Sequence, residues 1–177
     1  AARLAADADA LVLVSPHLLD DPVLAAAHRA GKAVVIANGV DVAEARRRAG
    51  EPLDHAWLDG SQPTVLAIGR LAPQKNFPTL LRAIARLAAE RPVRLVILGE
   101  SRDSARAELL AQARSLGIEQ RVLLPGTTDN VYTWLKRADA LALPSWWEGS
   151  SNVLLEAMAV GTPVVASRTE DLALSSR

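Results

Sequence analysis

Two glutamates, Glu148 and Glu156, stand eight positions apart in the segment from Pro144 to Val165. The second interrupts an otherwise apolar run of helix length, Val153 to Val160, between two segments that we predict to be buried strands. A charged carboxylate there needs a partner, because burying an unpaired charge costs on the order of several kcal/mol. The small residues Gly149 to Asn152 offer N-cap side chains and free backbone N–H groups at the positive end of the helix. This pattern suits a ligand with hydroxyl groups and phosphate.

The same segment resembles a known family. The Glu-x7-Glu spacing, followed by Ala-Met-Ala-Val-Gly-Thr-Pro-Val-Val-Ala, resembles the donor-binding signature of the retaining GT-B glycosyltransferases of family 4, the glycosyl transferases group 1. Asn38-Gly39-Val40-Asp41 is similar to the interdomain joint of that family, Gly69-Arg70 with Lys75-Asn76 to its diphosphate-binding loop, and Gly126 with Asn130 to the loop near the base. Four motifs in the family's order are specific, whereas a lone Glu-x7-Glu is not.

Apolar strands alternate with helix-length segments along most of the chain. Continuous Val, Leu and Ile runs are typical of parallel strands covered on both faces, so we predict an α/β fold with a Rossmann-like doubly wound parallel sheet, one half of a GT-B fold. The predicted strands are 64–69, 93–98, 121–124, 140–143 and 163–166, and the predicted helices are 78–90, 104–116, 131–136 and 152–160.

Residues 1–37 form a separate strand-helix-strand pattern, with strands at 11–14 and 33–36 and a helix near 21–29. The resemblance implies that 1–37 is the tail of an N-terminal acceptor domain, that 38–63 is the interdomain joint and linker, and that 64–177 is a nucleotide-sugar-binding C-terminal domain that is truncated. The chain departs from the family pattern after Ser167, where Arg-Thr-Glu-Asp-Leu-Ala replaces a Gly-Gly pair and a further glutamate.

The resemblance implies a role for each motif residue. Arg70 and Lys75 would stabilise the charge that grows on a leaving diphosphate. Pro78 indicates that a helix begins just after Lys75 and Asn76, so that a second helix N-terminus points at the same region. Without the family match, both would be ordinary exposed loop charges as readily as ligand contacts. Gly69 belongs to the same loop, and Asn130 would lie near the base.

Ionised carboxylates accept hydrogen bonds only, which suits a diol. The resemblance therefore implies that Glu156 binds the ribose hydroxyls and Glu148 those of the transferred sugar. The residues between them would approach the sugar phosphate or donate hydrogen bonds to it: Gly149, Ser150, Ser151 and Asn152. The alternatives are a solvent-facing Glu156 and a plain loop acid at position 148. Trp146 and Trp147 could stack on a sugar or a base, or simply pack against the loop.

Composition excludes several classes of protein. The 20 basic and 20 acidic residues give no electrostatic case for nucleic acid, and no apolar run is long enough to span a bilayer. The absence of cysteine is compatible with the cytosol. The basic run Arg46-Arg47-Arg48 could touch the inner face of a membrane peripherally, or lie on a solvated helix or linker. No histidine has the spacing of a zinc site or triad, so we expect no cofactor and no metal.

The sequence therefore predicts the donor-binding part of a retaining hexosyltransferase, which uses a nucleoside diphosphate sugar, UDP-linked by analogy, and a glycan or lipid acceptor bound by a missing N-terminal domain. The family members whose motif sequences are most similar to those of this chain build bacterial surface polysaccharides. A non-catalytic nucleotide-binding module and a nucleotide-sugar epimerase of the same architecture are the alternatives. We expect the isolated chain to be inactive in transfer.

Overall fold

The computed structural model describes residues 7–53, 55–100 and 103–168. The chain divides into two compact units, the first made of Ala1–Gly39, Trp147–Asn152 and Arg168–Arg177, and the second of Val40–Trp146 and Val153–Ser167. The departure from the family pattern lies, apart from Arg168, outside the described residues.

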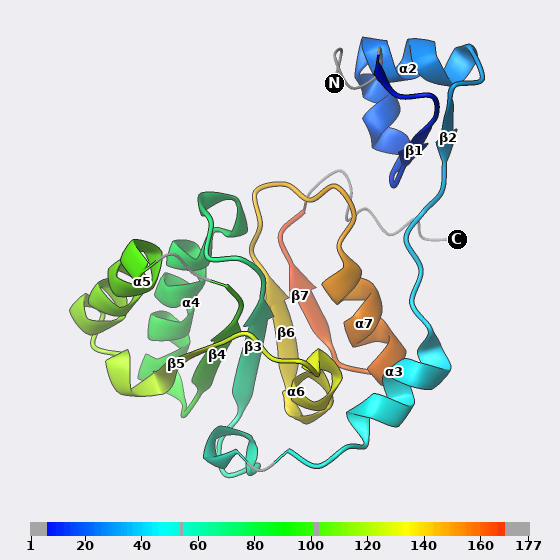
Figure 1. Ribbon diagram of the computed structural model, residues 1–177. Coiled ribbons are helices and arrows are strands. Elements are labelled where there is room, and N and C mark those ends of the chain that lie inside the picture. The colour runs from blue at the N-terminus through cyan, green and yellow to red at the C-terminus, as the bar shows by residue number, and fades with distance from the viewer. Residues whose placement is uncertain (1–6, 54, 101–102, 169–177) are drawn as a thin grey trace. The chain divides into compact units, whose positions relative to one another are not determined.

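The second unit is built on five parallel strands in the order β5-β4-β3-β6-β7 (Figure 1). The strands are β3 (Thr64–Ile68), β4 (Arg94–Leu98), β5 (Val122–Gly126), β6 (Ala140–Leu143) and β7 (Val164–Ala166). The chain starts at the centre, runs outward to β5 and returns to the other side of β3. This is a doubly wound sheet, as predicted, and its order reverses between β3 and β6, where ligands bind in such folds.

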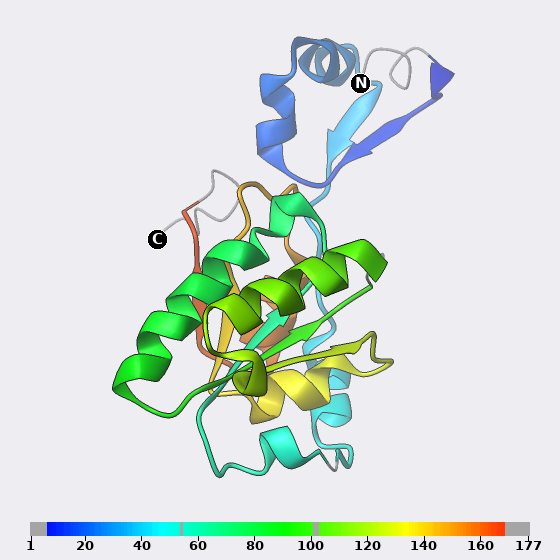
Figure 2. The same ribbon diagram turned by 90° about the vertical axis from the view of Figure 1, so that its left-hand side faces the viewer.

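Helices cover both faces of this sheet, which explains the continuous apolar strands. In Figure 1, α4 and α5 lie on one face, whereas α6 and α7 lie on the other; Figure 2 shows α4 and α5 side by side in front of the strands. Their bounds are α4 (Phe77–Glu90), α5 (Asp103–Ser115), α6 (Val131–Arg137) and α7 (Asn152–Val160). The core beneath α4 and α5 includes Leu81, Leu95 and Ile97, each at most 1% exposed.

The segment 38–63, predicted as joint and linker, contains a helix, α3 (Val42–Ala49), and a 3-10 turn, η2 (Ala56–Leu58). Asp41 caps α3 by accepting a hydrogen bond from the backbone N–H of Glu44 (2.9 Å). The helix buries Ala45 and Ala49 and packs against α6. The capping pattern Asp-x-x-Glu could have revealed this helix, but its run of arginines gives only a narrow apolar stripe.

The basic run on α3 makes bonds within the chain. Arg46 donates to the carbonyl of Ala159 (3.1 Å), and Arg48 donates to the carbonyl of Asp129. Arg47 pairs with Glu44 and Glu51. Arg46 therefore links α3 to the last turn of α7, and Arg48 links it to the loop before α6.

The first unit contains a parallel pair of strands, β1 (Leu11–Leu13) and β2 (Ala33–Val35), with Leu11 opposite Ala33. A 3-10 turn, η1 (Pro16–Asp20), and a helix, α2 (Pro22–Arg29), connect them. Asp21 caps α2 by accepting from the backbone N–H of Val23 (2.8 Å). The strand-helix-strand order agrees with the pattern expected from the sequence.

Glycines end three adjacent strands of the second unit at the carboxyl edge. Gly69 follows β3, Gly99 follows β4 and Gly126 ends β5; the N–H of Gly69 donates to Leu98 and that of Gly99 to Gly126. Gly99 has a φ of 152°, and a Cβ there would lie 2.0 Å from the carbonyl oxygen of Gly69. Only glycine lets these strand ends approach so closely.

We expect Gly99→Ala to destabilise the fold by more than about 2 kcal/mol, because a backbone carbonyl must move to admit the methyl group. Urea unfolding monitored by circular dichroism measures this. Gly161→Ala is the matched control, since Gly161 also has a positive φ, of 80°, but no atom within 4 Å of the added Cβ. The control should lose only about 1 kcal/mol of backbone strain. Equal losses in the two variants would contradict the close-approach explanation.

Candidate functional site

The loops after β3 and β6 are hydrogen-bonded to each other where the strand order reverses. The side-chain amide of Asn76 donates to the carbonyl of Pro144 (3.1 Å), and the backbone N–H of Trp146 donates to the carbonyl of Gln74 (2.9 Å). Between these contacts Ser145 is 1% exposed. The carboxyl edge of the sheet thus carries a fixed pair of loops at its switch point.

The loop after β3 presents two cations. Gly69, with a φ of 152°, lies under the aliphatic part of Lys75, where a Cβ would meet the Lys75 Cε at 2.7 Å. Lys75 is partly buried at the end of a 3-10 turn, η3 (Pro73–Lys75). Arg70 is exposed and has no ion pair or side-chain hydrogen bond within the part of the chain that the structure describes.

Asn76 sets the direction in which α4 leaves this loop. It adopts left-handed backbone angles (φ 52°, ψ 33°), the one non-glycine residue with positive φ among the described residues. Its Oδ1 accepts a hydrogen bond from the Thr79 hydroxyl (2.8 Å) while its Nδ2 bonds Pro144. Asparagine tolerates this conformation better than most residues. The helix therefore begins at Phe77, just after Lys75 and Asn76, as Pro78 predicts.

Glu156 lies on α7, partly buried, and no described residue donates a hydrogen bond to it or forms an ion pair with it. Desolvation raises the pKa of its carboxyl group above the ordinary value. Desolvation, and next the negative charge of Glu156, also raises the pKa of Tyr132 in the first turn of α6. A carboxylate with this environment and no protein partner is a candidate ligand-binding group.

Asn130 has a structural role in this conformation. Its Oδ1 caps α6 by accepting from the N–H of Tyr132 (3.2 Å), and its Nδ2 donates to the carbonyl of Arg48 (3.0 Å) and to Glu51 Oε2 (2.7 Å). The guanidinium of Arg48 lies over the Tyr132 ring, 5.6 Å from its centroid. The side chain of Asn130 thus joins α3 to α6 and fixes Tyr132.

The remaining predicted site residues, Glu148 to Asn152, belong to the first unit. Glu148 is 7% exposed, whereas Gly149 and Asn152 are exposed and Ser150 and Ser151 are partly buried. Asn152 accepts at Oδ1 a hydrogen bond from Asn38 Nδ2 (2.7 Å), also in the first unit.

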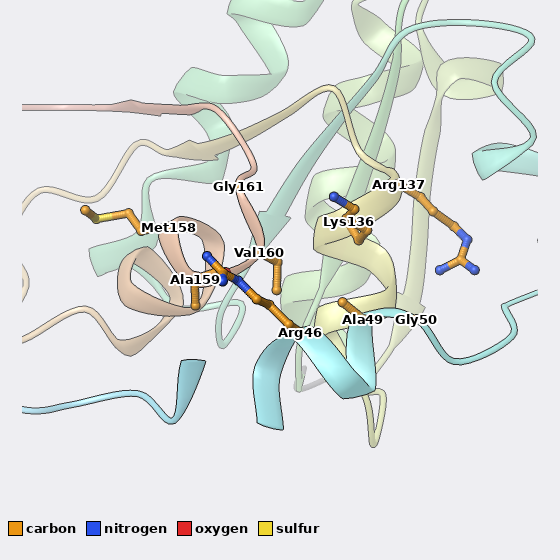
Figure 3. Close-up of a pocket in the computed structure, with 9 residues that line it drawn as sticks. All are labelled: Arg46, Ala49, Gly50, Lys136, Arg137, Met158, Ala159, Val160 and Gly161. Atoms are coloured by element: carbon orange, nitrogen blue, oxygen red, sulfur yellow. The ribbon is translucent and has the colours of Figure 1, made fainter. Parts of the chain in front are cut away.

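Two hollows mark opposite edges of the second unit. One of about 530 Å³ adjoins the carboxyl edge and is lined by Arg70, Glu100 and Ser104, among others. Another of about 470 Å³ lies where α3, α6 and α7 end (Figure 3). Figure 3 shows Arg46 reaching toward Ala159 and Arg137 extending away from the hollow. Cations at helix C-termini satisfy terminal carbonyls and the helix dipole, and two cations of this second hollow do so: Arg46 donates to Ala159 of α7 and Arg137 to Thr133 of α6.

Two further observations concern metals and membranes. Residues 7–53, 55–100 and 103–168 contain no group of three or more His, Asp or Glu side chains that could hold a metal ion. None of the helices in these ranges is long and apolar enough to cross a membrane.

The second unit is a Rossmann-like α/β domain whose switch point presents an arginine and a lysine and whose helix α7 carries a glutamate with no partner among the described residues. Residues 62–175 match the family described as "Glycosyl transferases group 1". The chain belongs to this family.

Individual relatives agree with this assignment. The chain is 37% identical over 136 residues to the N-acetylgalactosamine-N,N'-diacetylbacillosaminyl-diphospho-undecaprenol 4-alpha-N-acetylgalactosaminyltransferase of Campylobacter jejuni, covering 77% of this chain and 35% of that protein. It is 35% identical over 179 residues to the D-inositol 3-phosphate glycosyltransferase of Mycobacterium leprae, covering 97% of this chain and 39% of that protein. The chain thus spans about a third of the length of these relatives.

Among solved structures, the chain is similar in fold to Anabaena Alr3699/HepE in complex with UDP and glucose, with a TM-score of 0.76 at 24% identity over 95% of this chain and 47% of that one. Together with the parallel sheet this confirms the predicted fold class, a doubly wound sheet of the GT-B type. Both of these relatives, from Campylobacter jejuni and Mycobacterium leprae, are named as glycosyltransferases.

Two positioning residues were missed at the sequence level. Asn76 was recognised only as part of the diphosphate-loop motif, because its hydrogen bond to Pro144 depends on a loop far away in sequence. Tyr132 gave no signal of its own, because its proximity to Glu156 arises from the packing of α6 and α7 on one face of the sheet.

Replacing Glu156 should change how stability depends on pH. Because its pKa is raised above 4.5, the folded state binds more protons than the unfolded chain in the window just above that value, so wild-type stability falls as the pH rises through it. Glu156→Gln lacks this loss. The midpoint of urea unfolding, measured from about pH 4 to about pH 8, reports this difference. As the pH rises, the stability of the variant relative to the wild type should increase and then become constant.

Glu90→Gln, at the exposed end of α4, serves as the control and should keep a constant offset from the wild type. A Glu156→Gln curve parallel to the wild type would contradict the desolvated environment of Glu156.

Proposed function

We propose that this chain forms the donor-binding part of a retaining glycosyltransferase of family 4, which transfers a hexosyl group from a nucleoside diphosphate sugar, UDP-linked, to a glycan or lipid acceptor. In this proposal residues 64–177 belong to the C-terminal domain and the acceptor binds to an N-terminal domain. The proposed setting is the cytoplasmic side of bacterial surface polysaccharide synthesis.

The observation that carries the proposal is the partly buried Glu156 on α7, which has no partner among the described residues, in the same unit as the switch-point loop that bears Arg70 and Lys75. An unpartnered carboxylate in a desolvated position destabilises the fold, and a ligand that donates hydroxyl groups would compensate for it. The ribose of a nucleotide is such a ligand, and its diphosphate matches the two cations.

The chemistry assigned to the cations is electrostatic. As the bond from sugar to phosphate breaks, negative charge grows on the leaving diphosphate, and positive charge fixed before the reaction stabilises it without reorganisation. Gly69 lets Lys75 lie close to the strand end, and Asn76 fixes the loop that carries it. Arg70, exposed and without a partner in the described chain, is available to the second phosphate.

The carboxylates and small residues complete the proposed site. Glu156 would accept from the ribose hydroxyls and Glu148 from the transferred sugar, while Gly149, Ser150, Ser151 and Asn152 would meet the sugar phosphate. Asn130 would line the base. Because its amide already binds Arg48 and Glu51, its contribution there is to fix the backbone of the loop.

The names of the relatives support this choice of substrates. The Campylobacter jejuni protein is named for a diphospho-undecaprenol-linked substrate, and the Anabaena protein was crystallised with UDP and glucose. We propose donor binding without metal, since Arg70 and Lys75 supply the charge. Peripheral membrane contact stays a prediction; Arg46, Arg47 and Arg48, the residues predicted to make it, also bond within the chain.

Lys75→Ala and Glu156→Ala should weaken nucleotide binding in different ways. Losing a hydrogen bond to a charged group costs about 1.5–3 kcal/mol, which is about tenfold or more in affinity. Lys75→Ala should weaken binding of both UDP and pyrophosphate, whereas Glu156→Ala should weaken only UDP. Isothermal titration calorimetry with UDP, GDP, ADP and pyrophosphate, with and without a chelator, measures these affinities.

Lys136→Ala, an exposed lysine near the opposite edge, is the matched control and should bind like the wild type. UDP affinity unchanged in a folded Glu156→Ala variant would overturn the ribose assignment. Binding abolished by the chelator would overturn the metal-free site. Binding of nucleotide by the wild type, with no transfer by any longer protein that contains this chain, would favour a non-catalytic nucleotide-binding module.

Residues 1–177 alone should transfer no sugar. Holding donor and acceptor together contributes about 7–11 kcal/mol to lowering a barrier of this kind, and in this proposal residues 1–177 bind only the donor. Nucleotide release from a panel of sugar donors with mixed acceptors should stay at background for this chain and rise for a protein extended at both ends. Robust transfer by the short chain would place the acceptor site within it.

A further inference from the structure

The tryptophans of the second unit have contrasting environments. Trp134 is 5% exposed and its ring lies 4.9 Å from that of His55. The ring of Trp57 is covered by the guanidinium of Arg94 at 5.5 Å. Trp146, in contrast, is 64% exposed. The packing role considered for Trp146 from the sequence therefore does not account for its side chain.

The backbone beneath this exposed indole is held from two sides. The N–H of Trp146 donates to Gln74 (2.9 Å), and Asn76 donates to Pro144 (3.1 Å). From the other side, the Ser167 hydroxyl donates to the carbonyl of Ser145 (2.5 Å). The residue before Trp146 is thus fixed and buried, while the indole itself lies in water.

An exposed aromatic ring on a fixed backbone is suited to binding. A tryptophan carries about 150–250 Å² of surface that gains from burial, and a preorganised backbone reduces the ordering that binding requires. Tryptophan is also among the residues most enriched where binding energy concentrates. The ring and its N–H donor together suit a ligand with an apolar face and a polar rim.

The position of Trp146 indicates which ligand this is. Its backbone bonds Gln74, the neighbour of Lys75, so the indole belongs to the part of the carboxyl edge proposed to hold the diphosphate. Glu156, proposed for the ribose, lies on α7 near Tyr132 instead. Beyond the diphosphate of a nucleotide sugar lies a pyranose ring, which has an apolar face of C–H groups and a rim of hydroxyls.

We propose that the indole of Trp146 stacks on a pyranose ring, in an extension of the proposed function that rests on it. The ring belongs either to the donor or to the acceptor. Stacking on an aromatic face requires the flat ring itself, so phenylalanine should replace tryptophan in large part and leucine should not. This requirement distinguishes stacking from a general apolar contact.

The experiment measures binding to the 177-residue chain in two arms. In the donor arm, calorimetry compares UDP with UDP-glucose, UDP-galactose, UDP-N-acetylglucosamine and UDP-N-acetylgalactosamine. In the acceptor arm, the methyl glycosides of the same sugars are titrated with and without saturating UDP. The proteins are wild type, Trp146→Ala, Trp146→Leu, Trp146→Phe and the control Val165→Thr, whose side chain is 68% exposed on β7. Thermal unfolding checks that each variant is folded.

We expect Trp146→Ala and Trp146→Leu to lose about three- to tenfold of the affinity for sugar, with UDP affinity unchanged and Trp146→Phe and Val165→Thr close to wild type. A loss confined to UDP-sugars assigns the ring to the donor, and a loss confined to methyl glycosides assigns it to the acceptor. Sugar affinity that is absent from the wild type or unchanged in Trp146→Ala overturns the proposal, as does an equal loss for UDP. A wild type that binds no UDP overturns the proposed function alone, because the glycoside arm without nucleotide still tests Trp146.

Discussion

Two hydrogen bonds that join the loops after β3 and β6 fix the part of the candidate site that lies at the switch point of the second unit. One runs from Asn76 to the carbonyl of Pro144 and the other from Trp146 to the carbonyl of Gln74. Strands β3 and β6 are neighbours in the sheet but lie more than 70 positions apart in the chain. At a switch point the two following helices go to opposite faces, so the loops diverge unless something holds them together. These bonds fix the loop that carries Lys75 against the segment that leads to Trp146.

A close approach of strand ends also shapes the loop after β3, on the side of β4. Gly99 allows the carbonyl of Gly69 to lie against it, and Gly69 in turn allows Lys75 to lie over the end of β3. Asn76 then accepts a left-handed backbone, which costs a non-glycine residue about 1–2 kcal/mol, and recovers part of this through its bonds to Thr79 and Pro144. Strain at a site that several contacts determine is typical of positions that orient a ligand.

The sequence predicted the second unit well because its signals are local. Continuous apolar runs gave every strand of the sheet to within a few residues, and the bounds of β6 and α7 were predicted without error. Helix α3 was not predicted as an element of its own, because its arginines leave only two buried alanines, Ala45 and Ala49, as an apolar signal. The bonds of Asn130 to Arg48 and Glu51 could not be foreseen either, since they depend on α3 packing against α6. Residue types identified candidate groups, but only packing decides which of them have partners.

Polar residues that bond another part of the chain hold the fold together, whereas those without such a bond are candidates for binding a ligand. Asn130, Arg46 and Arg48 are polar residues of the kind that bind ligands, yet each bonds another part of the chain and thereby joins α3, α6 and α7. Glu156 lies among these same helices and is left without such a bond in the described chain, although desolvation already disfavours its charge. A fold selected for stability alone would have paired or replaced this carboxylate. Packing within the described chain gives Glu156 no such bond, and in the proposed function a hydroxyl-bearing ligand would supply one.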